Sequence, residues 1–120
     1  MKIDTLHTET TADERNVFSS VVSSVKSIVR RYDPEATIIL FGSRARGDYH
    51  EESDWDFIIL TDFAEQDDAT KQAIRREILH EIEFESHDHI ATIFHNKNVW
   101  QSDYQVTGLF RSIQEEGIVV

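Results

Sequence analysis

The chain has 120 residues, of which 39% are hydrophobic and 29% charged, which is typical of a globular protein rather than a disordered one. Its 12 Lys and Arg against 23 Asp and Glu give a formal net charge of -11, so it lacks the basic balance needed to bind duplex nucleic acid through its phosphates. The absence of cysteine excludes disulfides, thiol nucleophiles and thiolate zinc sites.

Residues 1–120 are predicted to form one domain, because a chain of this length builds a single hydrophobic core. Residues 1–10 are polar, lack the apolar core of a signal peptide and are predicted to form a flexible arm. No apolar run approaches the roughly 18 residues that a membrane-spanning helix needs. We therefore expect a cytoplasmic protein.

The first predicted elements are a helix and a strand. A capping box at residues 11–14 precedes apolar residues that recur at helical spacing up to Tyr32. The pair Asp33-Pro34 is expected to end this helix. The continuous apolar run of residues 37–41 then predicts a buried strand.

A polar segment separates this strand from the next one. Residues 42–53 contain two glycines and two arginines and are expected to form a long loop. Residues 54–61, which are apolar in their second half, predict the second strand. Because no helix is predicted between the two strands, we expect them to be antiparallel neighbours.

The second half of the chain predicts two helices and two further strands. Periodic apolar positions indicate a helix over residues 69–85, and residues 89–94 predict a strand. A last helix is expected over residues 99–116, followed by a small terminal strand at residues 118–120. The order predicts an α+β fold, a small mixed β-sheet flanked by helices that pack over one face.

The segment FGSRARGD, after the first strand, is the first part of a candidate site. Gly42 has no Cβ, so a phosphate group can approach its backbone closely, and Ser43 adds a hydroxyl donor. Arg44 and Arg46 add guanidinium groups, which bind phosphate oxygens in a bidentate manner. A P-loop is disfavoured, because Asp48 stands where that motif requires Lys.

Two carboxylates at the start of the second strand form the other part. Asp54 and Asp56 alternate with Trp55, which places both on one face with Cα atoms roughly 6–7 Å apart. Paired carboxylates suit Mg²⁺ ions that act on phosphate groups. Each part also has a structural explanation: Gly42-Ser43 as a turn, the two arginines as solvated surface residues and Asp54-x-Asp56 as a charged strand cap. Their combination on two adjacent strand ends favours a functional site.

Together these residues resemble a known family. Gly42-Ser43 and Asp54-x-Asp56, ten residues apart, match the signature of the DNA polymerase β-like nucleotidyltransferase superfamily, and GSRARGD…SDWD looks like its minimal, single-domain branch. The resemblance covers essentially the whole chain. It implies transfer of a nucleoside monophosphate, usually AMP from ATP, to a hydroxyl of a protein or small-molecule acceptor.

The resemblance also assigns roles to residues. It implies that Asp54 and Asp56 hold Mg²⁺ and act in catalysis. It assigns the triphosphate of ATP to the first motif, with Gly42 and Ser43 at the β- and γ-phosphates and Arg44 and Arg46 as further support.

Active relatives carry a third carboxylate on the following strand, as metal ligand or general base. Here that strand reads HIATIF and contains no acid, and the best alignment puts Ala91 or a neighbour at that position. Asp88, just before the strand, is the candidate to replace the missing group, and Glu83 and Glu85 are further candidates at a helix end.

A group of polar residues near this strand has two interpretations. His87, Asp88, His89 and His95 suggest a metal site or a histidine base. Their spacing lacks a recognised metal-ligand pattern, which favours ordinary polar residues at a strand entrance. Trp55 and Trp100 lie in apolar patterns and are predicted to be packing residues.

The expected partners follow from the resemblance. Some minimal members are paired with a small helical HEPN-type toxin RNase, which they silence by adding AMP to a tyrosine, so an antidote role is one expectation. Little room is left for an acceptor-binding domain, so a partner or a second copy is expected to complete that site.

Two other functions stay open. One is a catalytically degenerate module that binds nucleotide or a partner protein, for which the net charge of -11 would suit a basic RNase. The other is a two-metal phosphatase or nuclease, which the small number of further ligands disfavours.

Overall fold

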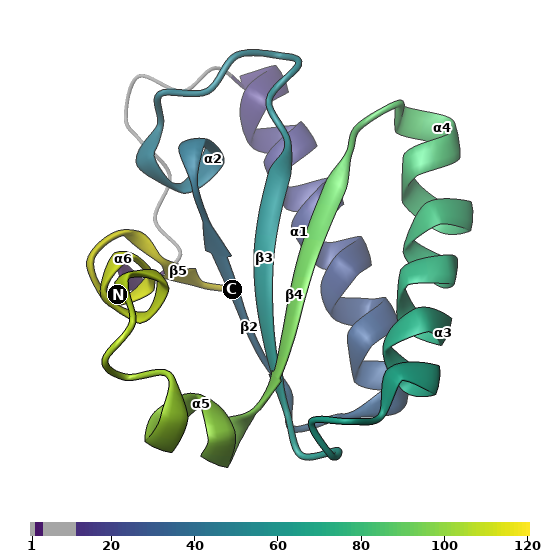
Figure 1. The fold of residues 1–120 in the computed structure, drawn as a ribbon. Coiled ribbons are helices and arrows are strands. Elements are labelled where there is room, and N and C mark those ends of the chain that lie inside the picture. The colour runs from purple at the N-terminus through teal and green to yellow at the C-terminus, as the bar shows by residue number, and fades with distance from the viewer. Residues whose placement is uncertain (1, 4–11) are drawn as a thin grey trace.

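The computed structural model describes residues 2–3 and 12–120. A five-stranded mixed sheet forms its centre, in the strand order β1-β5-β2-β3-β4 (Figure 1). Strand β2 is antiparallel to β3 and β5, whereas β4 is parallel to β3 and β1 is parallel to β5. The strands are β1 (Lys2–Ile3), β2 (Thr37–Phe41), β3 (Trp55–Thr61), β4 (Ile90–Asn96) and β5 (Ile118–Val119).

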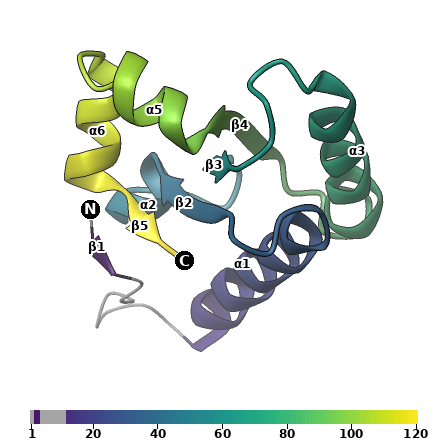
Figure 2. The ribbon, with the colours of Figure 1, turned by 90° about the horizontal axis from the view of Figure 1, so that it is seen from below.

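Helices cover both faces of the sheet, as the view along the strands in Figure 2 shows. One face carries α1 (Ala12–Tyr32), α3 (Asp68–Ile78) and the π-helical turn η1 (Leu79–Glu83), followed by the short α4 (Phe84–Ser86). The other face carries α5 (Lys97–Asp103) and α6 (Gly108–Glu116). The predicted α+β class and mixed sheet are confirmed, but the prediction of helices over one face is wrong.

The central strands explain why both faces need a cover. Strand β2 is apolar at consecutive positions, with Ile38 and Leu40 on one side and Ile39 on the other, and all three are fully buried. Such continuous apolar runs are typical of strands buried on both faces, whereas one-sided strands alternate. The core under α1 and α3 includes Trp55, and the core under α5 and α6 includes Trp100, so both tryptophans are packing residues as predicted.

Three element boundaries differ from the predictions. The predicted loop contains a one-turn helix, α2 (Ser43–Arg46), and the predicted helix over residues 69–85 changes to π-helix at η1. The predicted helix over residues 99–116 is two helices. The first helix ends at Asp103, and Thr107 is the N-cap of the second, since its side chain accepts a hydrogen bond from the Phe110 N–H.

The N-terminal segment lies partly outside the described residues. Lys2–Ile3 pairs with Ile118–Val119, so these two residues belong to the sheet rather than to a flexible arm. The rest of the predicted arm, and Thr11 of the predicted capping box, fall on residues that the structure does not describe. Within the described part of the chain, no helix is both long and apolar enough to cross a membrane.

Candidate functional site

The strand register brings the two predicted halves of the site together. Strands β2 and β3 are antiparallel neighbours, as predicted, and Phe41 pairs with Asp56. Gly42 follows Phe41 and has φ 74°, a conformation that favours glycine. A Cβ on Gly42 would lie 2.4 Å from Oδ2 of Asp56, so the carboxylate occupies the space that any other side chain would need.

A compact turn follows Gly42. The carbonyl oxygen of Gly42 accepts hydrogen bonds from the N–H groups of Ala45 (3.1 Å) and Arg46 (3.0 Å), which closes the single turn of α2. Gly47, with φ 91°, ends the turn and donates to the Ser43 carbonyl at 2.9 Å. Because the first amides of a helical turn have no partner within it, the N–H of Ser43 is available beside the carboxylate of Asp56.

The two aspartates form an electrostatically unfavourable pair. Asp56 lies on the same strand face as Ile58 and Leu60, which pack under α5 and α6. Partial burial raises the pKa of Asp56 above its ordinary value, and the charge of Asp54 raises it further, while His89 and Arg46 act in the opposite direction. A cation held between the two carboxylates would relieve this repulsion.

The residue beside Asp56 on the neighbouring strand β4 is an alanine. In the parallel pair β3–β4, Asp56 is in register with Ala91. Among the described residues, no group of three or more His, Asp or Glu side chains could hold a metal ion. The structure therefore does not gather Asp88 with Asp54 and Asp56 into a three-ligand set.

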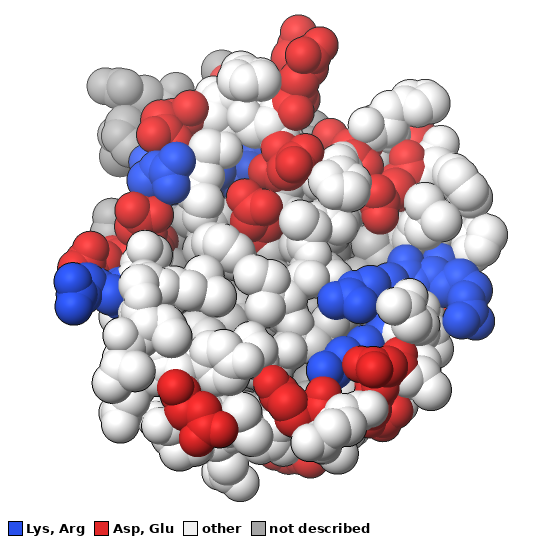
Figure 3. Space-filling model, viewed as in Figure 1, with Lys and Arg blue, Asp and Glu red and all other residues white. Residues whose placement is uncertain are grey.

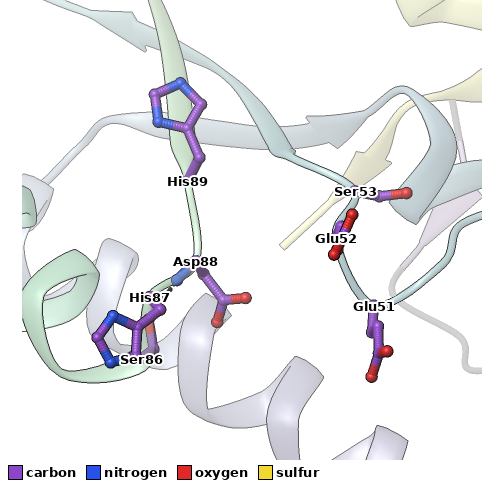
Figure 4. A pocket seen from close by; sticks show the side chains of 7 residues that line it. All are labelled: Glu51, Glu52, Ser53, Ser86, His87, Asp88 and His89. Carbon is purple, nitrogen blue, oxygen red and sulfur yellow. Dashed lines mark hydrogen bonds between the residues drawn. The ribbon is translucent and has the colours of Figure 1, made fainter.

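Asp88 lines an open pocket beside the aspartate pair (Figure 4). The pocket has a volume of about 350 Å³ and separates the loop before β3 from the loop before β4. In Figure 4 the Asp88 side chain points across it toward the segment of Glu51 and Glu52, whereas His89 points away. The lining residues are Glu51, Glu52, Ser53, Ser86, His87, Asp88 and His89.

The histidines do not form one cluster. Nδ1 of His89 lies 3.3 Å from Oε2 of Glu83, so Glu83 contacts a histidine rather than the aspartates. His95 lies at the other end of β4, where Nδ1 is 2.5 Å from Oε1 of Glu65 and the ring stacks on Trp100. The structure thus favours the interpretation of separate polar residues over a shared metal site.

Arg46 lies on the surface beside the site. Its Nε contacts Oδ2 of Asp48 at 3.2 Å, and its Nη1 contacts Oε2 of Glu116 at 3.1 Å, which links α2 to the end of α6. The hydrogen bonds that Arg46 donates to these two carboxylates, Asp48 first, raise its pKa. Sequence analysis did not single out Glu116, because no local pattern connects residues 70 positions apart.

Arg44 has a different environment, although it is only two residues from Arg46. It is buried, its Nη2 donates to the carbonyl oxygens of Ser53 (3.1 Å) and Glu51 (3.4 Å), and its guanidinium lies over the rings of Tyr49 and Trp55. These contacts place Arg44 beneath the loop that leads to β3.

Acidic side chains lie at both ends of the sheet. In Figure 3, which views the molecule as in Figure 1, they occur at the upper end of this face, where β3 and β4 begin, and also at its lower end. The centre of the same face shows few charged groups. The acidic side chains at the upper end favour cations over bare anions near the beginning of β3.

Comparisons with known proteins agree with this geometry. Residues 22–120 match the family model described as a nucleotidyltransferase domain. No curated protein matches the chain at a significant level.

Two solved structures share its fold. One, described as the crystal structure of a toxin-antitoxin with AMP-PNP, is 19% identical with a TM-score of 0.55, and the match covers 81% of this chain and 69% of that one. The other, described as the polymerase core of TRAMP, an RNA surveillance complex, is 15% identical with a TM-score of 0.59. That match covers 88% of this chain but only 41% of the polymerase chain. At these identities the likeness concerns the fold alone.

Proposed function

The chain belongs to the nucleotidyltransferase domain family, and we propose that it transfers AMP from ATP to a hydroxyl group of a protein or small-molecule acceptor, with Mg²⁺ as cofactor. The observation that carries the proposal is the contact between Gly42 and Asp56. It joins a backbone that a phosphate group can approach to a carboxylate that can hold a cation, at one point on two neighbouring strand ends.

The residues present fit a magnesium ion. Mg²⁺ is usually held by one or two carboxylates together with substrate phosphates, and Asp54 and Asp56 supply two. Burial and then the charge of Asp54 raise the pKa of Asp56, so a cation bound by the two carboxylates would offset an unfavourable charge interaction. When bound, the ion would neutralise phosphate charge and orient the triphosphate.

Residues of the first motif would bind the triphosphate. We assign the backbone of Gly42 and the hydroxyl and N–H of Ser43 to the β- and γ-phosphates. Arg46 would add a guanidinium, since its ion pairs with Asp48 and Glu116 are exposed and such pairs contribute about 1 kcal/mol or less. It can therefore exchange a carboxylate for a phosphate at small cost.

The transfer step needs a base for the acceptor. The acceptor oxygen would form a bond to the α-phosphorus, the bond to the β-phosphate oxygen would break, and pyrophosphate would leave. We assign the acceptor proton to Asp88, which lines the same pocket as Ser53, the residue before Asp54, and is separate from the metal-binding pair. The acceptor would enter through this pocket.

We further propose that the acceptor is a tyrosine hydroxyl of a helical toxin, which makes this chain the antidote of a pair. The fold is similar to that of a chain from a toxin-antitoxin crystal that contains AMP-PNP. The net charge of -11 would favour association with a basic toxin.

A second function is favoured by one specific observation. Ala91 stands in register with Asp56, at the place of a third carboxylate. A module that binds Mg²⁺ and ATP, or a partner protein, without transfer would need only the pair Asp54 and Asp56.

Labelled ATP separates these functions. Incubation of the protein with Mg²⁺, α-labelled ATP and tyrosine-bearing proteins is expected to release pyrophosphate and label an acceptor, and Asp54→Asn and Asp88→Asn are expected to abolish or strongly reduce both. ATP binding without pyrophosphate release would support the second function. Release of inorganic phosphate instead would indicate a phosphatase and contradict the proposal.

A further inference from the structure

We infer that Arg44 is a positioning residue for Asp54, which holds the segment of the first aspartate against α2, rather than a ligand of the triphosphate. The role of Asp54 in metal binding rests on the proposed function, whereas the effect of Arg44 on this segment is a property of the fold. The inference separates the two arginines of the motif, which the sequence pattern treats alike.

The first support is the burial of a charge without a counter-ion. The side chain of Arg44 is only 9% exposed, and arginine is seldom so buried unless it is paired. Among the ion pairs of the described residues, none involves Arg44, and its Nε is buried without a hydrogen-bond partner. Its position must therefore be stabilised by contacts other than carboxylates.

Those contacts are with the residues on both sides of Asp54. On the preceding side, Nη2 donates to the Ser53 carbonyl oxygen at 3.1 Å. This carbonyl belongs to the peptide unit that contains the Asp54 nitrogen, so its orientation fixes the backbone at Asp54. A second, longer bond to the Glu51 carbonyl holds the loop just before it.

On the following side, Arg44 lies against the ring of Trp55. The guanidinium carbon is 4.4 Å from the Trp55 ring centroid and 4.5 Å from that of Tyr49, distances typical of cation–π contacts. Trp55 is itself 1% exposed, and its backbone N–H donates to the carbonyl oxygen of His89, the residue just before β4. Arg44 therefore packs the residue after Asp54 into the sheet.

Arg46 provides the internal comparison. It is exposed, it pairs with Asp48 and Glu116, and its charge acts on Asp56. Positions two apart on a helical turn do not share a face, which explains the different environments of two such close arginines. For Arg44 to reach a phosphate, it would have to leave its carbonyl and ring contacts.

The test compares ATP affinity by calorimetry in EDTA and in Mg²⁺ for the wild type, Arg44→Lys and Arg46→Lys. The ratio of the two affinities measures the coupling between metal and nucleotide. We expect Arg44→Lys to keep metal-free affinity within about twofold and to reduce the coupling at least about tenfold. Arg46→Lys is expected to weaken metal-free binding. If Arg44→Lys weakens metal-free binding as Arg46→Lys does, Arg44 is a phosphate ligand and the inference is wrong.

Hydrogen exchange decides the inference without nucleotide. In Arg44→Lys, exchange at the amides of residues 53–56 is expected to accelerate at least about tenfold, while amides in the middle of β4 stay unchanged. Tyr49→Ala removes one of the two rings, leaves Arg44 in place and should give the same local effect in milder form, even if Arg44→Lys fails to fold. Tyr49→Phe, which keeps the ring, should match the wild type.

The two failures are distinguishable. Unchanged exchange at residues 53–56 in both Arg44→Lys and Tyr49→Ala would overturn the inference, whatever the nucleotide does. Failure of the wild type to bind ATP in EDTA or Mg²⁺ would instead count against the proposed function. Hydrogen exchange at residues 53–56 would still test the positioning role of Arg44.

Discussion

The position of the Asp56 carboxylate requires a glycine at residue 42. The carboxylate of Asp56 fills the space next to the Gly42 Cα, and the backbone there has a positive φ that other residues seldom adopt. Gly47 has a positive φ as well, but a Cβ on it would meet nothing within 4 Å. The two glycines therefore allow backbone strain to be separated from displacement of the carboxylate.

Substitution of these glycines by alanine tests the contact. Both variants are expected to lose stability, by about 1–2 kcal/mol for the left-handed backbone. Only Gly42→Ala is expected to weaken Mg²⁺-dependent ATP binding, by about tenfold or more, because its Cβ would push the Asp56 carboxylate away. Chemical denaturation and calorimetry measure both effects. Equal ATP affinity in Gly42→Ala and Gly47→Ala would contradict this role of the contact.

Asp56 is predicted to destabilise the fold that it serves. Its pKa is raised in the folded state, by burial and then by Asp54. At neutral pH the ionised carboxylate is therefore less favourable in the folded protein than in the unfolded chain, which lowers the free energy of unfolding. Asp56→Asn is expected to raise the melting temperature by about 1–3 °C at pH 7, a modest gain because the group is partly solvated. The same variant should lose Mg²⁺-dependent ATP binding.

The pH dependence gives the sign of this effect. For an acid with a raised pKa, the unfavourable contribution is present above the folded-state pKa and disappears as the pH falls through it. The stability difference between Asp56→Asn and the wild type should therefore shrink on acidification. A lower melting temperature for Asp56→Asn at pH 7 would contradict the account.

At the scale of elements, Glu65 fastens the loop between β3 and α3 to the end of β4. Its Oε1 lies 2.5 Å from Nδ1 of His95, and its Oε2 accepts from the Asn96 N–H at 2.7 Å. Asn96 in turn caps α5, with its side chain accepting from the N–H groups of Asn98 and Val99. One carboxylate thus joins three elements at the end of the sheet opposite the candidate site.

Glu65→Gln is expected to lower stability at pH 7 by about 1–2 kcal/mol, a typical loss for charge-assisted hydrogen bonds. Burial opposes ionisation of Glu65, but the bonds from Asn96 and His95 outweigh it and lower its pKa. An acid with a lowered pKa stabilises the fold above its unfolded-state pKa and loses this effect as the pH falls through the folded-state pKa. Denaturation curves measured from pH 7 to pH 3 should show a smaller decrease in the free energy of unfolding for Glu65→Gln than for the wild type. Parallel decreases in the two proteins would contradict the stabilising role of the Glu65 carboxylate.

The register of β3 and β4 makes Ala91 a position where function can be added. Ala91 is in register with Asp56. Ala91→Asp would place a third carboxylate beside the pair, and we expect Mg²⁺ to increase ATP affinity at least about threefold more than in the wild type. Ala91→Asn has nearly the same shape without the charge and should show no gain. A gain in both variants, or in neither, would mean that residue 91 does not face the metal.

The elements show what local sequence could predict. No crossover helix was predicted between residues 37–41 and 54–61, so the two strands were expected to be antiparallel neighbours, and the register confirms this because α2 is only a single turn. The continuous apolar runs also indicated burial, but not that two separate cores need two layers of helices. The break before Thr107 was not predicted because apolar residues continue on both sides of it. The capping hydrogen bond forms only because the Thr107 backbone is extended, which the sequence does not show.

Contacts between distant residues were beyond the sequence. Glu65 and His95 are 30 residues apart, and Arg46 and Glu116 are 70 apart, so no spacing rule connects them. The chemistry of Arg44 was equally hidden, since only the folded loop shows that its guanidinium meets backbone carbonyls and aromatic rings. Residue types indicated a phosphate and metal site, but the direction of each side chain came from the fold.

On the scale of the whole molecule, the candidate site lies at one end of a small acidic domain. The net charge is -11, and acidic side chains form a rim at the end of the sheet where β3 and β4 begin, as others do at the opposite end (Figure 3). Such a rim repels a free triphosphate and attracts cations, so nucleotide binding should depend strongly on a divalent metal. This dependence is the property that distinguishes the proposed site from a general anion-binding surface.

Calorimetric titration of ATP, with Mg²⁺ and with EDTA, into the wild type and into Asp54→Asn/Asp56→Asn tests this claim most directly. We expect the wild type to bind ATP with Mg²⁺ at least about tenfold more tightly than with EDTA, and the double variant to lose that difference. The melting temperature of the double variant would show that it is folded. Binding that is equal in both proteins, or absent from the wild type, would contradict the assignment of the two aspartates as the metal and nucleotide site.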